Sequence, residues 1–504
     1  MTNHLFGQIR DAIRVPEQIF LQTPNGEALT YADMLATSAR FAAALVALGV
    51  QPGDRVAVQV EKSPEALMLY LGCVRAGAIF LPLNTAYTAA ELDYFIGDAE
   101  PKVFVCDPGK HQVLAPSAAK AGVGAVETLG SDGRGTFTDK AAAQTGAFDD
   151  IPRGPEDLAA ILYTSGTTGR SKGAMLSHDN LASNAKILVE YWKFTGTDVL
   201  LHVLPIYHTH GLFVATNIVL FCGAKMIFLA KFDADEILRQ MPVATSMMGV
   251  PTFYTRLLQH PGLTAQATHH MRLFVSGSAP LLAETHREWR QRTGHAVLER
   301  YGMTETNMST SNPYDGERRA GAVGFPLPGI DLRIVDPETG KSLGTEEIGM
   351  IEVKGSNVFK GYWRNPGKTA AEFRPDGFFI TGDLGKSDCD GYVHIVGRGK
   401  DLIITGGFNV YPKEVETEID ALAGVIESAV IGVAHKDFGE AVTAVIATEM
   451  GANLLEEAIC ANLESRLAKF KLPKRVIFVD QLPRNAMGKV QKNVLREQYK
   501  DLFA

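Results

Sequence analysis

Over its first 106 residues the chain alternates between amphipathic helical segments and short apolar runs, with a signal at each boundary. Thr30 and Asp33 form a capping-box pattern before an apolar-periodic segment that runs to Leu48, and Thr88 and Glu91 repeat the pattern. Buried strands are expected at residues 55–60, 78–83 and 103–106. Because each crossover helix must lie on the sheet, this alternation predicts parallel strands with helices on both faces.

The pattern changes from about residue 331. Short alternating segments, such as 332–335 and 350–353, are separated by turn signals, which predicts a small antiparallel region before Gly397. Beyond Lys400 the order of elements is that of an α+β domain, with a helix, two strands, a helix, a strand and a terminal helix.

The length of the chain also requires more than one domain. Its 504 residues exceed the size at which a single hydrophobic core keeps growing. We therefore predict an α/β fold with a large N-terminal domain of parallel sheets plus the small antiparallel region, residues 1–399, and a small α+β C-terminal domain, residues 400–504.

Charge and cysteine content exclude several functional classes. The chain has 49 Lys and Arg against 57 Asp and Glu, so no global positive field would attract nucleic acid. Its five cysteines form no CxxC pair, which argues against a disulfide framework or a thiolate zinc site. The start lacks a secretory pattern, and the longest charge-free apolar stretch, 211–224, is too short to span a membrane. A cytoplasmic protein without a membrane partner is expected.

A loop rich in small donors follows the apolar run 158–162. Residues 163–173 contain three glycines, five Ser or Thr hydroxyls and Lys172. The backbone N–H groups of such a loop can surround phosphate oxygens, and the hydroxyls and the lysine supply further contacts. The loop is not a Walker motif, and no GxGxxG fingerprint occurs in the chain. A phosphate-binding loop of another type is therefore predicted.

This loop is the first of five motifs that occur in a familiar order. They are residues 164–173, Tyr301-Gly-Met-Thr-Glu-Thr306, Thr381-Gly-Asp383, residues 397–407 and residues 483–489. Together they resemble the adenylate-forming superfamily of acyl-CoA synthetases, peptide-synthetase adenylation domains and firefly luciferases. Within it, the segments 204–216 and 293–302 resemble the malonyl-CoA synthetases.

The resemblance implies a two-step ligase reaction, with ATP and CoA as co-substrates and Mg²⁺ as cofactor. A carboxylate attacks the α-phosphorus of ATP to give acyl-AMP and pyrophosphate, and the CoA thiol then attacks the acyl carbon and expels AMP. The first step brings two anions together, so the site needs fixed positive charge.

The resemblance also implies roles for individual residues. Lys489 bridges the acid carboxylate and the α-phosphate, Glu305 holds Mg²⁺, Asp383 accepts hydrogen bonds from the ribose hydroxyls, and Tyr301 stacks on adenine. The implied ATP-binding set is Thr164, Ser165, Gly166, Thr167, Thr168, Gly169, Lys172, Ser278, Ala279, Tyr301, Gly302, Met303, Thr304, Asp383, Arg398 and Lys489, and the implied catalytic set is Lys489, His208, Thr304 and Glu305.

The C-terminal domain is expected to be mobile. Lys489 must leave after the first step because CoA needs the same space, and the resemblance places the hinge at Lys400. Rotation would bring Gly406 and Gly407 to the pantetheine channel, so Lys400, Gly406 and Gly407 are the expected CoA-binding residues. Lysines in such loops are acylated in related synthetases, so a lysine acyltransferase and a deacylase acting on Lys489 are expected partners.

The acid is expected to be a small dicarboxylate. A second carboxylate needs a cation, because an unpaired buried carboxylate costs several kcal/mol. Arg287 is the predicted cation, since its planar fork suits a carboxylate, and His208 is expected to donate to the acid. Malonate and methylmalonate are not distinguished, because one methyl group is worth only ~1 kcal/mol.

Two other readings of the motifs stay open. One is a related adenylation chemistry, either a domain that loads a carrier protein or an oxygen-using luciferase. The other is a nucleotide-binding regulatory protein without catalysis, against which Glu305, Asp383, Arg398 and Lys489 argue.

Overall fold

The computed structural model describes residues 2–164, 171–449, 451–452, 454–464, 466–485 and 488–503. The chain divides into two compact units. Unit 1 consists of Met1–Ala320, Gly324–Asp331 and Val353–Phe379, and unit 2 consists of Gly321–Val323, Leu332–Glu352 and Ile380–Ala504. The predicted domain boundary at residue 400 stays a prediction. Among the described residues, no helix is long and apolar enough to cross a membrane.

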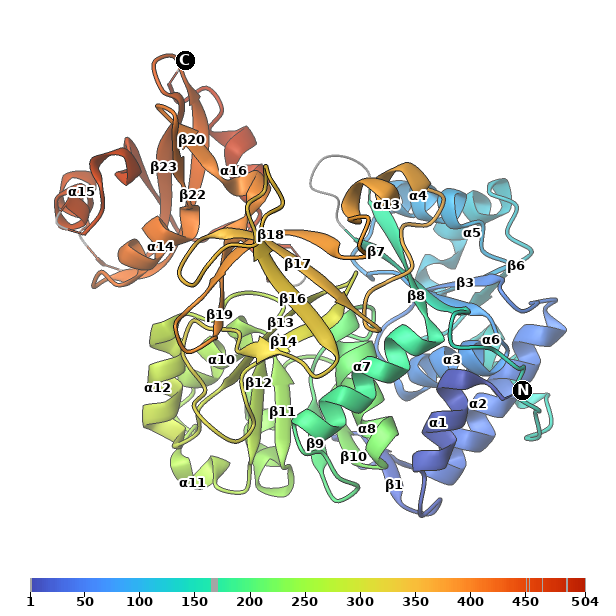
Figure 1. Cartoon of the computed structure of the whole chain (residues 1–504). Helices are drawn as coiled ribbons and strands as arrows, with labels where there is room; N and C mark the ends of the chain where they lie inside the picture. The colour runs from blue at the N-terminus through green and yellow to red at the C-terminus, as the bar shows by residue number, and fades with distance from the viewer. Residues whose placement is uncertain are drawn as a thin grey trace. The chain divides into compact units, whose positions relative to one another are not determined.

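The first sheet of unit 1 has six strands, shown in blue and teal in Figure 1. All neighbouring pairs are parallel except the last. The order is β6 (Ala125–Thr128), β5 (Val103–Cys106), β3 (Arg55–Gln59), β4 (Ile79–Pro82), β7 (Leu158–Thr164) and β8 (Lys172–Ser177). One face packs against α4 (Ala89–Ala99) and α5 (His111–Lys120). Helices α2 (Tyr31–Ala47), α3 (Pro64–Arg75) and α6 (Thr136–Ala142) lie on the other side (Figure 1).

Both capping boxes form as predicted. The Thr30 side chain accepts the Asp33 N–H at the start of α2, and Thr88 does the same for Glu91 at the start of α4. After α2 the chain turns at Gly49 with φ 84°, a conformation that glycine adopts without strain. The local signals in the sequence therefore set these helix boundaries.

The second sheet of unit 1 has nine strands. Its central six, from β13 to β1, are parallel, and antiparallel strands flank them on both edges. The order is β15 (Phe325–Pro326), β14 (Asn307–Ser311), β13 (Leu298–Met303), β12 (Leu273–Ser276), β11 (Ser246–Gly249), β9 (Val199–His202), β10 (Lys225–Phe228), β1 (Ile19–Gln22) and β2 (Ala28–Thr30).

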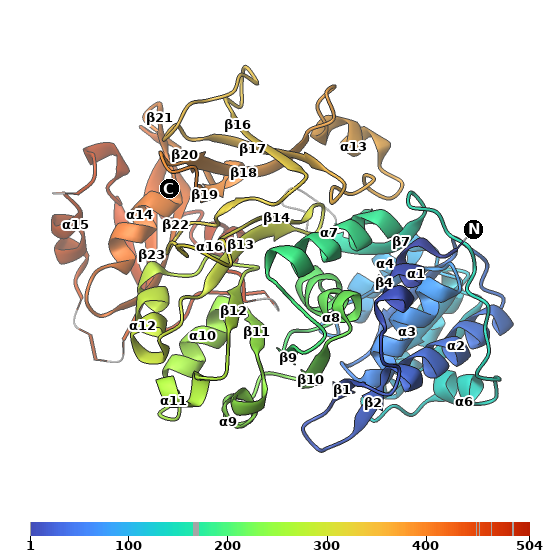
Figure 2. The ribbon, with the colours of Figure 1, turned by 60° about the horizontal axis from the view of Figure 1, so that its bottom comes forward.

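Helices cover both faces of this sheet. Helices α10 (Pro251–Leu258), α11 (Ala265–Thr268) and α12 (Ala283–Thr293) lie along one side, while α7 (His178–Tyr191) and α8 (Asn217–Cys222) lie along the other (Figure 1, Figure 2). Trp289 of α12 and Tyr254 of α10 meet edge to face in the hydrophobic core between α10–α12 and the sheet. A π-helical turn, His210–Thr216, precedes α8. The remaining helices of unit 1 are α1 (His4–Ala12), α9 (Ala234–Gln240) and α13 (Pro366–Glu372).

Unit 2 combines most of a four-stranded sheet with an α+β region. The first sheet has the order β16 (Ile330–Val335), β17 (Gly349–Gly355), β18 (Phe379–Ser387) and β19 (Val393–Arg398). The second has the order β21 (Phe408–Val410), β20 (Ile403–Thr405), β23 (Gly439–Thr448) and β22 (Val425–His435), with β24 (Arg475–Val479) parallel to β23. Helices α14 (Pro412–Asp420) and α15 (Glu456–Glu464) pack on one face, and Leu495 of α16 (Lys492–Gln498) joins a second core. The predicted fold class is confirmed.

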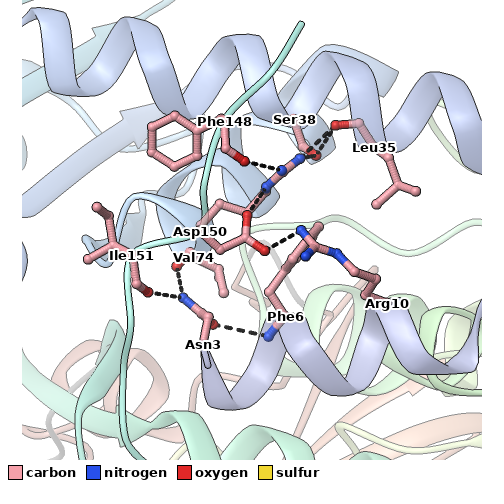
Figure 3. Close-up of polar contacts among 10 residues, drawn as sticks. Asn3, Phe6, Arg10, Leu35, Ser38, Val74, Phe148, Asp150 and Ile151 are labelled. Carbon is pink, nitrogen blue, oxygen red and sulfur yellow. Dashed lines mark hydrogen bonds and ion pairs between the residues drawn. The ribbon is translucent and has the colours of Figure 1, made fainter. Parts of the chain in front are cut away.

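A buried polar network ties α1 to α3 and to the segment 148–151 (Figure 3). The Asn3 amide donates to Val74 O at 2.7 Å and to Ile151 O at 3.0 Å. Asp150 accepts from Arg75 Nε at 2.6 Å and also pairs with Arg10. Since the side chains of Arg75 and Asp150 are 4% and 8% exposed, the pair is almost completely desolvated.

Arg75→Met is therefore expected to destabilise the protein by about 3 kcal/mol, because it leaves the buried Asp150 carboxylate with one cation fewer. Urea unfolding measures the change. Arg40→Met is the control, since Arg40 makes its hydrogen bond to Thr37 on its own helix. Equal stability of the two variants would contradict the importance of the network.

Candidate functional site

Several predicted residues follow the carboxyl ends of parallel strands in the nine-stranded sheet. The predicted residue His208 comes after β9, with His210 two positions later, and the predicted residue Ser278 comes after β12. Because the carboxyl ends of parallel strands meet at one edge of a sheet, these segments converge, which is where ligands bind in open α/β sheets. The register between β12 and β13 pairs Ser276 with Glu299, so Arg300 lies level with Gly277.

Arg300 is a buried cation without a partner in the described part of the chain. Its side chain is 4% exposed, and its Nε and Nη2 have no hydrogen-bond acceptor there. Burial lowers the pKa of Arg300 to about 9. A Cβ atom on Gly277 would lie 2.2 Å from Arg300 Cζ, so the guanidinium group occupies the space beside this glycine.

His210 lies beside the same loop. Its Nδ1 is 3.2 Å from Ser278 Oγ, and its buried Nε2 has no partner among the residues described. Burial first, and then the positive charge of Arg300, lower the pKa of His210 well below its ordinary value. The imidazole is therefore neutral at neutral pH. Ser278 has φ 71°, a left-handed conformation that a residue other than glycine or asparagine adopts at a cost.

Arg300, His210 and Ser278 together offer donors for an anion. A buried guanidinium that lacks a carboxylate partner is costly, and an anionic ligand would remove that cost. Arg287, the predicted cation, lies on α12 with its side chain exposed, which argues against its binding a buried carboxylate. Sequence reasoning missed Arg300, although it directly precedes the Tyr301 motif, because nothing local indicates that it is buried.

His208, the other residue predicted to contact the acid, is half-buried. Its ring centroid lies 5.4 Å from that of Tyr207, and its carbonyl accepts the Leu212 N–H at 2.9 Å. His208 also contributes to lowering the pKa of His210, so the two rings are electrostatic neighbours.

Glu305, the predicted metal ligand, belongs to a second cluster in unit 1. Its side chain is buried, and its Oε1 accepts from the Tyr362 hydroxyl at 3.1 Å. The same hydroxyl lies 2.5 Å from Glu372 Oε2. Lys172 Nζ is 3.5 Å from Glu372 Oε1 and 4.5 Å from the centre of the Tyr362 ring. The predicted phosphate-binding lysine and the predicted metal ligand therefore contact one tyrosine.

The surroundings of Glu305 fit a Mg²⁺ ion that is held partly by the protein and partly by substrate phosphates. No group of three or more His, Cys, Asp or Glu that could hold a metal occurs among the described residues. Mg²⁺ is commonly held by one or two carboxylates together with substrate phosphates, and a single buried glutamate matches that arrangement.

Only some of the other residues predicted to bind the nucleotide in unit 1 belong to the described part of the chain. Ser165, Gly166, Thr167, Thr168 and Gly169 lie outside the described residues, between the ends of β7 and β8. The flanking Thr164 and the later residues Ala279, Tyr301, Met303 and Thr304 are half-buried, and a Cβ on Gly302 would lie 1.9 Å from Asn307 O. Gly302 is thus held against the backbone of β14.

In unit 2, Asp383 and Arg398 face each other across β18 and β19. Arg398 Nε donates to Asp383 Oδ1 at 2.8 Å, and the Asp383 side chain is 5% exposed. The Thr381 hydroxyl accepts the Asp383 N–H at 3.1 Å and donates to Ile351 O at 2.8 Å. Arg398 therefore contacts the carboxylate directly, and Thr381 holds the backbone of Asp383.

The residues predicted for domain movement and CoA are also in unit 2. Lys400 is exposed in a short 3₁₀ turn, Gly399–Asp401, directly after Arg398. Gly406 and Gly407 form the exposed turn between β20 and β21, with φ 57° and 82°. Lys489 is exposed, and its N–H donates to Asn485 Oδ1 at 3.0 Å.

Comparisons with known proteins identify the family of the chain. Residues 10–363 match the model of the AMP-binding enzyme family, and residues 414–489 match that of the AMP-binding enzyme C-terminal domain. A malonate–CoA ligase of Arabidopsis thaliana is 35% identical over 89% of this chain and 78% of its own length. A long-chain-fatty-acid–CoA ligase of Bacillus subtilis is 34% identical over 97% of this chain and 93% of its own.

A solved structure agrees over the whole length. The crystal structure of ATP-bound MatB from Rhodopseudomonas palustris is 66% identical, with a TM-score of 0.98 and complete coverage of both chains. With a family model that spans most of the large unit and a second that spans the C-terminal region, this chain belongs to the AMP-binding enzyme family.

Proposed function

We propose that the protein is an ATP-dependent malonyl-CoA synthetase. Malonate attacks the α-phosphorus of ATP to give malonyl-AMP and pyrophosphate, and the CoA thiol then attacks the malonyl carbon to give malonyl-CoA and AMP. An AMP-forming acid–thiol ligase is the chemistry of the family, and relatives named as malonate–CoA ligases support the choice of acid.

The observation that carries the choice of acid is the unpaired Arg300 guanidinium beside His210 and Ser278. Aliphatic and aromatic monocarboxylates have no second charge to place there, and their binding would leave the buried cation uncompensated. The distal carboxylate of malonate supplies two acceptor oxygens that match the planar fork of arginine. We assign Arg300 this role in place of the exposed Arg287.

The proposed first step depends on cations and neutral donors that hold two anions together. Arg300 and His210 hold the distal carboxylate, His208 donates to the acid, and Lys489 bridges the reacting carboxylate and the α-phosphate. Lys172 and the loop that precedes it bind the outer phosphates. Each cation lowers the repulsion between carboxylate and triphosphate, which is the main barrier to their approach.

Mg²⁺ is the proposed cofactor of this step. Glu305 would hold it together with oxygen atoms of the nucleotide, and the ion supplies positive charge to the phosphates. Tyr362 orients Glu305 through its hydroxyl. Asp383 and Arg398 are proposed to bind ribose and phosphate, while Tyr301, Ser278, Ala279 and the turn 302–304 line the adenine and phosphate site.

The second step is proposed to need a movement of the C-terminal domain about Lys400. The movement withdraws Lys489 and brings Gly406 and Gly407 to the thiol of CoA, where the lack of side chains leaves room for pantetheine. Acylation of Lys489 by a lysine acyltransferase would remove its charge and stop the first step, and a deacylase would restore it. The cytoplasmic location remains a prediction from the sequence.

The test is acid-dependent exchange of labelled pyrophosphate into ATP with acetate, malonate, methylmalonate, succinate and octanoate. Malonate is expected to have the highest kcat/KM, with acetate and octanoate lower by about 100-fold, because they lack the second carboxylate. Methylmalonate is expected within about tenfold of malonate. Octanoate as the best acid would refute the proposal, and formation of malonyl-AMP without transfer to CoA would favour an adenylation domain that loads a carrier protein.

A further inference from the structure

We propose that Lys62 is a positioning residue of the acid site, which acts through His202 on the π-helical turn that carries His210. This inference rests on the proposed function, since it takes His210 and Arg300 as the groups that bind the acid. Lys62 lies far from both in sequence, between β3 and α3, and no motif includes it.

Lys62 is buried and has neutral partners. Its side chain is 8% exposed, and its Nζ lies 3.0 Å from His202 Nδ1 and 2.8 Å from His202 O. The same Nζ lies 4.2 Å from the centre of the Phe228 ring. Burial lowers the pKa of Lys62 well below its ordinary value, and in either charge state the amine has enough hydrogens to donate to both His202 atoms. A long lysine stem thus joins the β3–α3 connection of the first sheet to the end of β9 in the second.

The partners of His202 fix which ring nitrogen carries the proton. His202 Nε2 lies 2.9 Å from Gly211 O, and a carbonyl oxygen can only accept. Nε2 must therefore carry a hydrogen, which leaves Nδ1 of the neutral ring as the acceptor for Lys62. Lys62 thus selects the tautomer that donates to Gly211 O. The assignment follows from the hydrogen-bonding partners alone.

Gly211 is clamped from two directions. Its carbonyl accepts from His202 Nε2 and from the Thr216 hydroxyl at 3.0 Å. On the other side, a Cβ on Gly211 would lie 2.0 Å from Pro205 O, so the backbone is packed against the preceding loop. The next residue toward the N-terminus is His210, whose Nδ1 meets Ser278 Oγ.

Loss of the Lys62 donor would allow the His202 ring to adopt its other tautomer, in which Nε2 cannot donate. The Gly211 carbonyl would then lose one of its two side-chain donors, and the turn that aims His210 at the acid would shift. Apart from Ser278, the residues proposed to bind the nucleotide lie on other segments. The expected signature is therefore a change in the use of the acid and not of ATP.

The first experiment measures malonate-dependent pyrophosphate exchange with purified full-length Lys62→Met. We expect the KM for malonate to rise at least tenfold while the KM for ATP stays within twofold. Lys225→Met is the matched control, because Lys225 is a partly buried lysine that also joins two segments, by donating to Gln22 Oε1 at 2.6 Å within the nine-stranded sheet. It should leave both KM values within twofold. Equal effects of Lys62→Met on the two substrates, or none, would overturn the proposal.

A second pair of variants tests the role of His202 independently of Lys62. Glutamine offers a donor for Gly211 O next to an acceptor for Lys62, whereas leucine offers neither. His202→Gln is therefore expected to keep the malonate KM within about threefold of wild type, and His202→Leu to raise it at least tenfold. Equal impairment of the two variants would contradict the proposed action of Lys62 through His202. Because neither variant changes Lys62, this comparison tests the proposal even when Lys62→Met does not fold.

A spectroscopic measurement reports the tautomer directly. In ¹⁵N-histidine-labelled protein, the His202 ring, assigned from its absence in His202→Gln, should show a protonated Nε2 and an unprotonated Nδ1. Lys62→Met should average the two nitrogen shifts, and an unchanged spectrum would contradict the proposal. If the wild type prefers another acid, the proposed function is wrong but the proposal for Lys62 is still tested. The KM comparison is then made with the preferred acid.

Discussion

Arg300→Met is expected to lower kcat/KM for malonate in the exchange reaction by about 1,000-fold, since loss of one partner from a buried ion pair costs 3–5 kcal/mol. The KM for ATP should change little. Methionine keeps an unbranched side chain in the space beside Gly277, so the loop that carries Ser278 should stay in place. Exchange kinetics with malonate and ATP varied separately measure both effects.

Two comparisons make this prediction specific. Arg287→Met, a change of the same kind on the exposed face of α12, is expected to keep malonate kinetics within twofold. Arg300→Met should also be more stable to urea than wild type in the absence of ligands, because it removes a desolvated charge without a partner. The proposal for Arg300 would fail if Arg287→Met were the impaired variant, since that result would restore the prediction from the sequence.

Lys489→Ala is expected to abolish malonyl-AMP formation, with a loss of at least 1,000-fold, while thioester formation from preformed malonyl-AMP and CoA falls less than tenfold. The reason is that its charge is needed only while the two anions approach each other. Single-turnover assays of each half-reaction separate the effects, and Lys489→Gln, which mimics the neutral acylated side chain, should behave in the same way.

Lys500→Ala is the control for this lysine. Lys500 is likewise exposed in unit 2, and its ion pair is with the nearby Glu497, so both half-reactions should stay within twofold of wild type. Equal damage to the two half-reactions by Lys489→Ala would contradict the proposed exchange of Lys489 for CoA.

The sequence predicted those parts of the fold that short-range chemistry determines. The capping boxes at Thr30 and Thr88 formed as expected because each involves residues three positions apart. The strand at 103–106 was predicted to the residue, since an apolar run between polar boundaries has few alternatives. The π-helical turn at His210–Thr216 was not predicted, because it depends on contacts with Pro205 and His202 that periodicity does not encode.

The residues of the candidate site also fall into those that local sequence motifs indicate and those that depend on long-range packing. Motifs identified the segments that carry Lys172, Glu305, Asp383 and Lys489, and the roles of these residues remain predictions. The acid-binding group was harder, because arginines on a helix and in a strand look alike in sequence. Arg287 and Arg300 differ in burial, which the packing of β13 between its neighbours determines. Lys62 and His202 lie 140 positions apart, and only the packing of two sheets brings them together.

The 2.2 Å separation between a hypothetical Cβ on Gly277 and Arg300 Cζ constrains how such an enzyme could evolve toward other acids. A side chain at position 277 would meet the guanidinium end of Arg300, so the arginine would have to leave the position in which it is proposed to bind the distal carboxylate. A change at position 277 would therefore alter the preference for the acid without any substitution of Arg300, and libraries that vary the two codons separately and together would separate the two effects.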